Sequence, residues 1–194
     1  MRFTLLVMIA VTIALYLGGW SARWAIDHSS EIGTVVVGQW QATPFAGAPD
    51  ADPYSKARLA VLGNLTLGIG EGIQFRSSAD EAGRPLRREC SYVIAGTTPP
   101  ARIFTLAAYQ PEGQLIRPSA GRPGWLTSNN LMRDDANAFK IAVGPKATAG
   151  NWLATSGTGP MTLMLALYDT PASAASGASS LALPSITREG CLDG

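Results

Sequence analysis

The chain opens with one long apolar segment and continues as short apolar runs separated by turns. No charged residue lies between Arg2 and Arg23, and Phe3 to Leu17 is almost wholly apolar. An uncharged run of about 20 residues is the length that an α-helix needs to cross the hydrocarbon core of a bilayer. Aromatic residues gather at one end of this run, as in an interfacial aromatic belt: Tyr16, Trp20 and Trp24. The pattern predicts a transmembrane signal anchor over residues 1–25.

Two other interpretations of this segment stay open. A cleaved signal peptide has an apolar region of about 7–15 residues and small residues at its cleavage site. Here the run is longer, and the triplet Trp20-Ser21-Ala22 contains a bulky residue. The third interpretation is a buried helix of a soluble domain. Arg2 favours a cytoplasmic N-terminus, although Arg23 on the other flank weakens that bias.

Beyond a polar juxtamembrane linker at 26–32, the apolar residues form short runs with a strand-like pattern. Many short runs at about 10-residue spacing, cut by Gly and Pro, favour a β-sandwich or a jelly roll. We therefore expect one mainly β domain over 33–194, with a low-complexity, flexible loop at 172–180. The expected strands are 33–41, 72–77, 86–95, 102–109, 115–117, 125–128, 139–143, 151–154 and 161–168, and a short closing segment follows at 181–191.

Two runs carry the expected core, a third is expected to be half-exposed, and one helix interrupts the pattern. The runs 103–109 and 161–168 are apolar on both faces, which predicts central strands covered on each side. In 86–95 apolar and polar positions alternate, which predicts a half-exposed strand. Asp52 and Pro53 are a helix cap and a first helical residue, so we expect one short helix there, ended by Gly63 or Gly68.

The composition excludes several classes of function. Lys and Arg number 15 and Asp and Glu 14, so no basic field is present to bind nucleic acid. The charged fraction is 15%, below the ~25% of an average soluble domain. We expect no nucleic-acid partner.

Metal and histidine chemistry have few residues to use. His28 is the one histidine, and it lies next to the predicted anchor. One His and two distant Cys cannot fill four tetrahedral zinc positions, so we expect no metal site and no cofactor. Cys90 and Cys191 both follow the anchor, and in an exported domain such a pair is a candidate disulfide. Two free buried thiols are the alternative.

A few side chains remain as candidates for binding or catalysis. Glu71 and Asp80 could belong to an acidic site, but nothing in their spacing shows that they converge. Arg102 could contact an anionic ligand, because the arginine fork suits carboxylates and phosphates. Three tryptophans of the exported part are candidates for ligand or partner contact: Trp40, Trp125 and Trp152.

An ordered series of short stretches resembles the domain of unknown function family 1214. The series spans about residues 35–191. It comprises Asp52-Pro53-Tyr54, Glu71, Phe75, Asp80, Gly83, the run Cys90 to Gly96, Pro100-Ala101-Arg102, Thr105-Leu106, Tyr109, Gly113, Leu115-Ile116, Asn151-Trp152-Leu153, Leu165 to Tyr168, Leu183 to Ile186 and Cys191.

The resemblance implies a jelly-roll-like β domain and no established catalytic residue. In longer relatives this domain follows a companion N-terminal domain of family 1254, which implies a separately encoded partner for a short, membrane-anchored member. The chain departs from the family pattern at two places. Ile103-Phe104 replace a Trp-rich run, and Ala166 replaces an Arg, so a binding role of that Arg would be missing here.

Together these features predict a single-pass protein of the cytoplasmic (inner) membrane with its C-terminal domain in the periplasm or extracytoplasmic space. We expect a non-catalytic module that binds an envelope partner protein or a glycan- or lipid-like ligand. The alternative is a carboxylate-dependent enzyme acting on cell-envelope saccharides.

Overall fold

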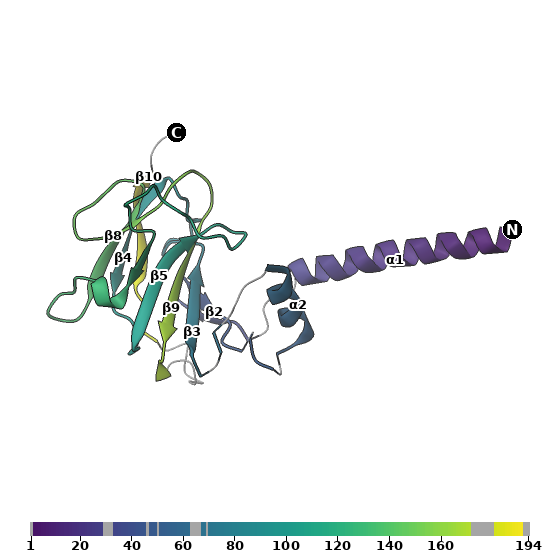
Figure 1. Cartoon of the computed structure of the whole chain (residues 1–194), viewed down its shortest axis with the longest axis horizontal. Coiled ribbons are helices and arrows are strands. Elements are labelled where there is room, and N and C mark those ends of the chain that lie inside the picture. Colours follow the sequence, from purple (N-terminus) through teal and green to yellow (C-terminus); the bar gives the residue numbers. More distant parts are fainter. Residues whose placement is uncertain are drawn as a thin grey trace.

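The computed structural model consists of a β domain and a long N-terminal helix that projects from it (Figure 1). The structure describes residues 2–28, 33–45, 47–49, 51–62, 67–68, 70–171 and 181–191. The loop expected at 172–180, Gly63 and residues 29–32 of the expected linker lie outside these ranges.

Helix α1 (Arg2–His28) is the apolar segment at the start of the chain. Its residues Arg2–Ile26 are long and apolar enough to span a membrane, and none of that window is buried against the rest of the protein. The helix continues to His28, three residues into the segment that we expected to be a polar linker.

Helix α2 (Pro53–Leu62) begins where the cap residue predicts. The Asp52 carboxylate accepts hydrogen bonds from the backbone N–H groups of Tyr54 and Ser55, both at 3.0 Å. These bonds satisfy donors that an uncapped helix start leaves free. The helix lies beside the C-terminal end of α1 (Figure 1).

Two β-sheets form the domain, as the pattern of short runs predicts. The six-stranded sheet has the order β1 (Val35–Val37), β2 (Trp40–Ala42), β3 (Gly72–Ser77), β9 (Thr162–Tyr168), β5 (Ile103–Tyr109) and β6 (Trp125–Thr127). The four-stranded sheet has the order β10 (Ser185–Cys191), β4 (Cys90–Gly96), β7 (Phe139–Gly144) and β8 (Asn151–Ala154). A short 3₁₀ turn, η1 (Ser128–Asn130), follows β6.

The core lies between the two sheets. Alternate side chains of β9 and β4 point into it, among them Leu163, Leu165, Tyr92 and Ile94, all at most 1% exposed. Trp40 closes one side of the core, where its indole N–H donates to the Pro184 carbonyl oxygen at 2.7 Å. The alternation expected for 86–95 is therefore confirmed within β4.

The outer face of the six-stranded sheet differs from our expectation. β9 and β5 are central strands, as predicted, but Met164 and Thr105 on their outer face are only half-buried. Only small outer residues are buried, such as Ala166 at 4%. No second layer covers this face among the described residues, so one face of each strand is partly open to solvent.

Several expected strands have different limits. The run 33–41 contains two strands, because Gly38 at φ 59° reverses the chain between β1 and β2. The run 86–95 becomes a strand only at Cys90. The run 115–117 forms only an isolated bridge, between Leu115 and Tyr109. The closing segment contains β10.

Strands β7 and β8 run parallel, although only residues 145–150 connect them. Parallel neighbours usually need a crossover of a dozen or more residues. Here β7 ends at Gly144, and β8 begins at Asn151, which lies opposite Ile141. The connecting segment therefore returns along β7 by only three residues, about 10 Å. Six residues can cover that distance, and the returning segment lies beside β7.

Candidate functional site

A groove of about 640 Å³ lies on the outer face of the four-stranded sheet. Its floor is formed by small apolar side chains of β4 and β7, namely Val93, Ala95 and Ala142. The segments 132–134 and 148–151 also line it, together with the exposed Lys140 and Glu189. This volume is within the range of ligand sites, about 300–1,000 Å³.

The two lining segments are held together by Asn151 at the start of β8. Its amide oxygen accepts the Met132 backbone N–H at 2.8 Å, and its amide nitrogen donates to the carbonyl oxygens of Met132 and Lys140 at 2.8 and 3.0 Å. The short return from β7 to β8 therefore places Asn151 where it fixes the neighbouring loop. These three hydrogen bonds hold the walls of the groove in place, and a preorganised site lowers the entropic cost of binding.

Two further residues fix the loop at 132–138. The Asp134 carboxylate accepts the backbone N–H groups of Ala136 and Ala138 at 3.0 and 2.8 Å. The Arg133 guanidinium packs 5.5 Å from the ring centres of both Phe104 and Phe139. Asp134 and Arg133 thus hold the loop in place. Lys140 and Glu189 also line the groove as exposed charged residues.

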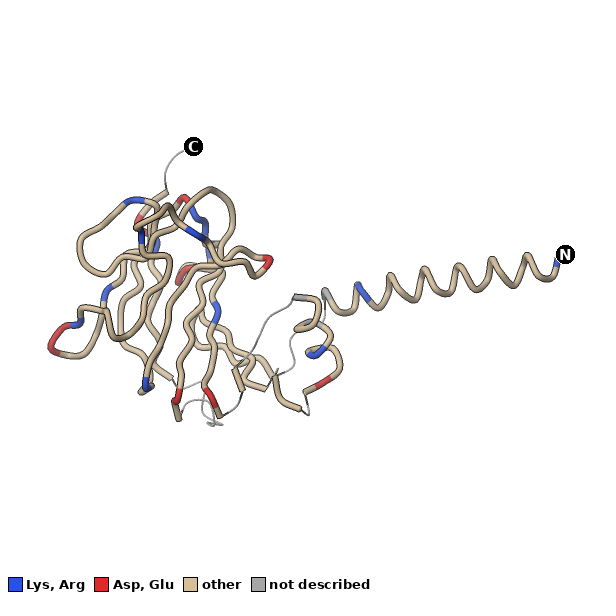
Figure 2. Tube along the Cα trace, viewed as in Figure 1, with Lys and Arg blue, Asp and Glu red and all other residues tan. Residues whose placement is uncertain are grey.

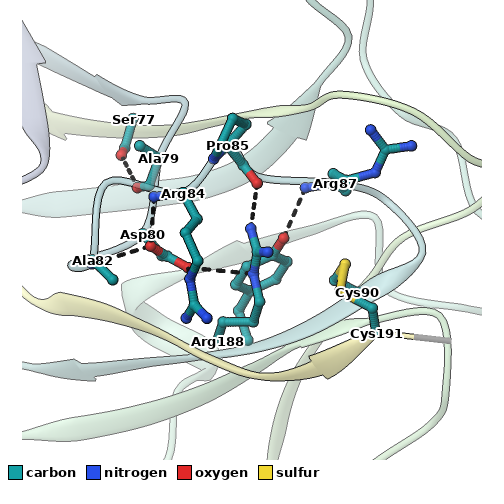
Figure 3. A network of polar contacts seen from close by, with 11 residues as sticks. Ser77, Ala79, Asp80, Ala82, Arg84, Pro85, Arg87, Cys90, Arg188 and Cys191 are labelled. Atoms are coloured by element: carbon teal, nitrogen blue, oxygen red, sulfur yellow. Dashed lines mark hydrogen bonds and ion pairs between the residues drawn. A yellow bond between two sulfur atoms is a disulfide. The ribbon is translucent and has the colours of Figure 1, made fainter. Parts of the chain in front are cut away.

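A second polar cluster lies at the end of the domain near the disulfide-linked residues (Figure 3). The Asp80 side chain is fully buried, and its carboxylate accepts the backbone N–H groups of Ala82 and Arg84 at 3.1 and 2.9 Å. Its other oxygen lies 2.9 Å from Arg84 Nε and 3.3 Å from Arg188 Nε. Asp80 therefore ties the β3–β4 turn to edge strand β10.

Arg188 continues this cluster toward Tyr92. Its guanidinium donates to the Pro85 carbonyl oxygen and lies 5.4 Å from the centre of the Tyr92 ring. The Tyr92 hydroxyl in turn accepts the Arg87 backbone N–H at 2.8 Å. The cluster joins three segments of the chain and leaves no oxygen of Asp80 without a partner.

The same contacts control the ionisation of two carboxyl groups. Burial alone would raise the pKa of Asp80, but the hydrogen bonds from Arg84 and the charges of Arg84 and Arg188 outweigh it and lower the pKa. Burial also opposes ionisation of Glu89, whose pKa is nevertheless lowered by hydrogen bonds from its own backbone, from Arg87 and from Gly159. Both groups are thus held as anions in structural contacts.

The structure does not bring Glu71 and Asp80 together. Glu71 precedes β3 and Asp80 follows it, so the two lie at opposite ends of a strand about 20 Å long. Glu71 accepts the Gly68 backbone N–H at 3.0 Å. These two carboxylates therefore cannot act on one bond as an acid and base pair.

Arg102 lies at the same end of the domain as Glu71. Its guanidinium is 3.9 Å from the Asp169 carboxylate, and both side chains are more than 70% exposed. The Asp169 backbone N–H donates to the Glu71 carbonyl oxygen at 2.8 Å. An exposed pair of this kind contributes little stability. Arg102 is thus available to solvent but is remote from the groove lining.

The three candidate tryptophans have three different environments. Trp40 is a core residue at 1% exposure, so it cannot contact a ligand. Trp152 is half-buried, and its indole N–H donates to the Gly144 carbonyl oxygen at 3.0 Å. Trp125, at the edge of the six-stranded sheet, is 59% exposed. Only Trp125 presents most of its ring to solvent.

Cys90 and Cys191 lie opposite each other on β4 and β10, with their sulfur atoms at disulfide distance, 1.97 Å. The pair links edge strand β10 to the sheet. Within the described ranges no group of three His, Cys, Asp or Glu residues could hold a metal ion.

The family model described as "Protein of unknown function (DUF1214)" matches residues 71–172, more than half of the chain. The chain belongs to the DUF1214 family. The match is narrower than the span of about 35–191 expected from the resemblance, and it includes β3 to β9 with both loops that line the groove. No curated protein matches the chain.

Two solved structures resemble this DUF1214 chain. The VPA0106 protein from Vibrio parahaemolyticus is 15% identical and gives a TM-score of 0.61 over 91% of this chain and 44% of its own. A putative uncharacterized protein from Burkholderia cenocepacia is 14% identical, with a TM-score of 0.41 over 74% of this chain and 44% of its own. The first likeness supports the fold. The DUF1214 chain spans less than half the length of both proteins.

Sequence reasoning missed the groove. Its floor consists of small apolar residues that are ordinary for strands, and its walls depend on the parallel pairing of β7 with β8. Asn151 gave no usable local signal, because its partners Met132 and Lys140 lie 19 and 11 residues earlier in the chain.

Proposed function

We propose that this chain is a membrane-anchored module that binds a partner protein without catalysis. In this proposal α1 crosses the cytoplasmic membrane once, the chain after His28 leads to the domain, and the β domain lies in the extracytoplasmic space. The groove over β4 and β7 is the surface that receives the partner.

The groove is the observation that carries the proposal. Its floor of Val93, Ala95 and Ala142 is apolar, while Arg133, Asp134, Lys140 and Glu189 around it contribute two charges of each sign. An apolar floor with a charged rim fits a partner segment that buries small apolar side chains and places charged ones around them. The carboxylates Asp80 and Glu89, in contrast, are bound in structural contacts, which supports binding rather than acid–base catalysis.

The length of the relatives adds support for a protein partner. The matching fold occupies only 44% of the Vibrio parahaemolyticus structure, so that protein carries further chain beside it. A separately encoded partner, of the companion type that family 1254 represents, would supply such a part.

Site-specific photo-crosslinking from native membranes tests the binding surface. A benzophenone amino acid is placed at Lys140 in the groove or at Gln41, which is exposed on the other sheet. We expect one crosslinked protein from position 140 and none from position 41. Ala142→Arg should abolish the crosslink by filling the floor, whereas Gln41→Arg adds the same charge and should leave it unchanged.

Two results would overturn the proposed surface: equal crosslinking from both positions, or a crosslink that survives Ala142→Arg in a folded protein. Topology is tested separately with alkaline phosphatase fused after Gly194. Activity of the fused enzyme supports the extracytoplasmic placement, and an inactive, cytoplasmic fusion contradicts it.

A further inference from the structure

Arg88 is a half-buried arginine whose guanidinium has no acceptor among the described residues. It precedes β4, and its Nε is buried without a hydrogen-bond partner. The arginines around it are all used: Arg84 and Arg188 pair with Asp80, and Arg87 pairs with Glu89. An unpaired, half-buried guanidinium is unusual, because a buried donor without an acceptor is destabilising.

The backbone of Arg88 is fixed to the turn at 155–159. Its N–H donates to the Gly159 carbonyl oxygen at 2.9 Å, and its own carbonyl oxygen accepts the Thr155 hydroxyl at 2.7 Å. The guanidinium therefore has a defined position against this turn, which is a condition for recognising a ligand.

Two glycines make room for the guanidinium. A Cβ at Gly157 would lie 3.5 Å from Nη1 of Arg88, and a Cβ at Gly159 would lie 3.2 Å from Nη2. Both glycines have positive φ, 75° and 105°. Gly157 is exposed and Arg88 is only half-buried, so part of the guanidinium lies near solvent beside a turn whose two glycines carry no side chain.

The nearby carboxylate does not neutralise Arg88. One oxygen of Glu89 contacts Arg87, and the other accepts the Gly159 backbone N–H at 2.9 Å. The turn is held from its other side as well, since the Ser156 hydroxyl donates to the backbone carbonyl oxygen of Arg117 at 3.0 Å. Figure 2 shows several Lys and Arg positions at this end of the domain, near the C-terminus.

We propose that Arg88 and the glycine turn at 157–159 form a binding site for a small oxyanion, a phosphate or a carboxylate group. The planar guanidinium would bind two oxygens of the anion side by side. This site is independent of the groove proposed for the partner protein, which lies over β4 and β7.

Titration of the full chain in maltoside micelles tests the proposal, with inorganic phosphate and acetate as probes at constant ionic strength. The readout is the side-chain Nε–Hε NMR resonance of Arg88, assigned by its absence in Arg88→Gln. We expect a saturable shift. Saturation by phosphate alone assigns a phosphate site, saturation by acetate alone a carboxylate site, and saturation by both an oxyanion site that accepts either.

The matched control is Arg102→Gln, which removes the same charge from an exposed position at the other end of the domain. We expect Arg88→Gln to weaken phosphate binding at least about tenfold, because at least one charge-assisted hydrogen bond is lost. The thermal unfolding midpoint, measured at increasing phosphate concentration, reports this loss of affinity. Arg102→Gln should leave the dissociation constant within about twofold of the original.

Arg88→Lys keeps the charge without the fork and should also weaken binding, which separates geometry from charge. The proposal is overturned if the Arg88 resonance shifts no more with phosphate or acetate than with chloride. It is equally overturned if Arg88→Gln, folded by its amide spectrum, binds phosphate or acetate as the original chain does.

Discussion

Arg188 of edge strand β10 lies 3.3 Å from the buried carboxylate of Asp80, which belongs to the turn after β3. The contact joins the two sheets at the end of the domain that carries the disulfide pair (Figure 3). Because Asp80 also receives two backbone N–H groups and Arg84, its loss leaves several donors without an acceptor.

Replacing Asp80 should therefore destabilise the domain strongly. We expect Asp80→Ala to lower the free energy of unfolding by about 3–5 kcal/mol, as for one partner removed from a buried ion pair. Asp80→Asn keeps an oxygen for the turn and should cost less. Arg84→Ala should cost at most about 1 kcal/mol, because that side chain is 53% exposed. Urea unfolding followed by tryptophan fluorescence measures this order, and equal losses for Asp80→Ala and Arg84→Ala would contradict the role of Asp80.

The lowered pKa values of Asp80 and Glu89 predict acid sensitivity. In the unfolded chain these groups titrate near their ordinary values, 3.8 and 4.5. A group whose pKa is lower in the folded state stabilises the fold above its unfolded pKa, and this contribution disappears as the pH falls through the folded pKa. We expect the urea midpoint to be constant from pH 7 to about 5 and to fall below about 4.5. In Asp80→Asn the fall should be smaller, and an unchanged fall in that variant would mean that other groups carry it.

The elements that could be predicted from the sequence are those determined by residues close to one another in the chain. Asp52 and Pro53 determine the start of α2 through contacts within three residues, so the sequence was sufficient there. The central position of β9 followed from an apolar run that only a sheet interior can accommodate. The sequence did not show that 33–41 contains two strands, because a single glycine such as Gly38 inside an apolar run can either continue a strand or reverse the chain.

The groove and the Asp80 cluster could not be predicted because they depend on long-range pairing. Asn151 contacts Met132 and Lys140 only after β8 has paired in parallel with β7. Arg188 reaches Asp80 only after β10 has paired with β4, and no periodicity encodes that register. Trp40 illustrates the same limit, since its burial follows from the pairing of β2 with β3 and not from its neighbours in sequence.

The Cys90–Cys191 pair predicts a large effect of reduction. The pair closes a loop across a sequence separation of 101 residues. Constraining the unfolded chain in this way is worth about 4–5 kcal/mol in the chain-entropy model. We expect a reductant to lower the urea midpoint of the original chain and to leave the Cys90→Ala, Cys191→Ala double variant unaffected. Mass spectrometry should detect alkylated thiols only after reduction, and alkylation without reductant would show that the thiols are free.

We expect alanine at Gly72, at the start of β3, to destabilise the domain much more than alanine at Gly70. A Cβ at this position would lie 2.1 Å from the Leu167 carbonyl oxygen, in the backbone of the neighbouring strand β9. Neither backbone can move without separating Gly72 from its register partner Tyr168. Gly72→Ala should therefore cost about 1–3 kcal/mol or more, the range for overpacking a core.

Gly70, two residues earlier, is the matched control. A Cβ there would meet nothing within 4 Å. Both substitutions reduce the freedom of the unfolded chain by the same amount, so the difference between them reports the contact with β9 together with the strain of a side chain at the Gly72 backbone, φ 158°. We expect Gly70→Ala to stay within about 0.5 kcal/mol of the original chain in urea unfolding. Similar stability of the two variants would mean that β3 and β9 are less closely paired at this end than Gly72 indicates.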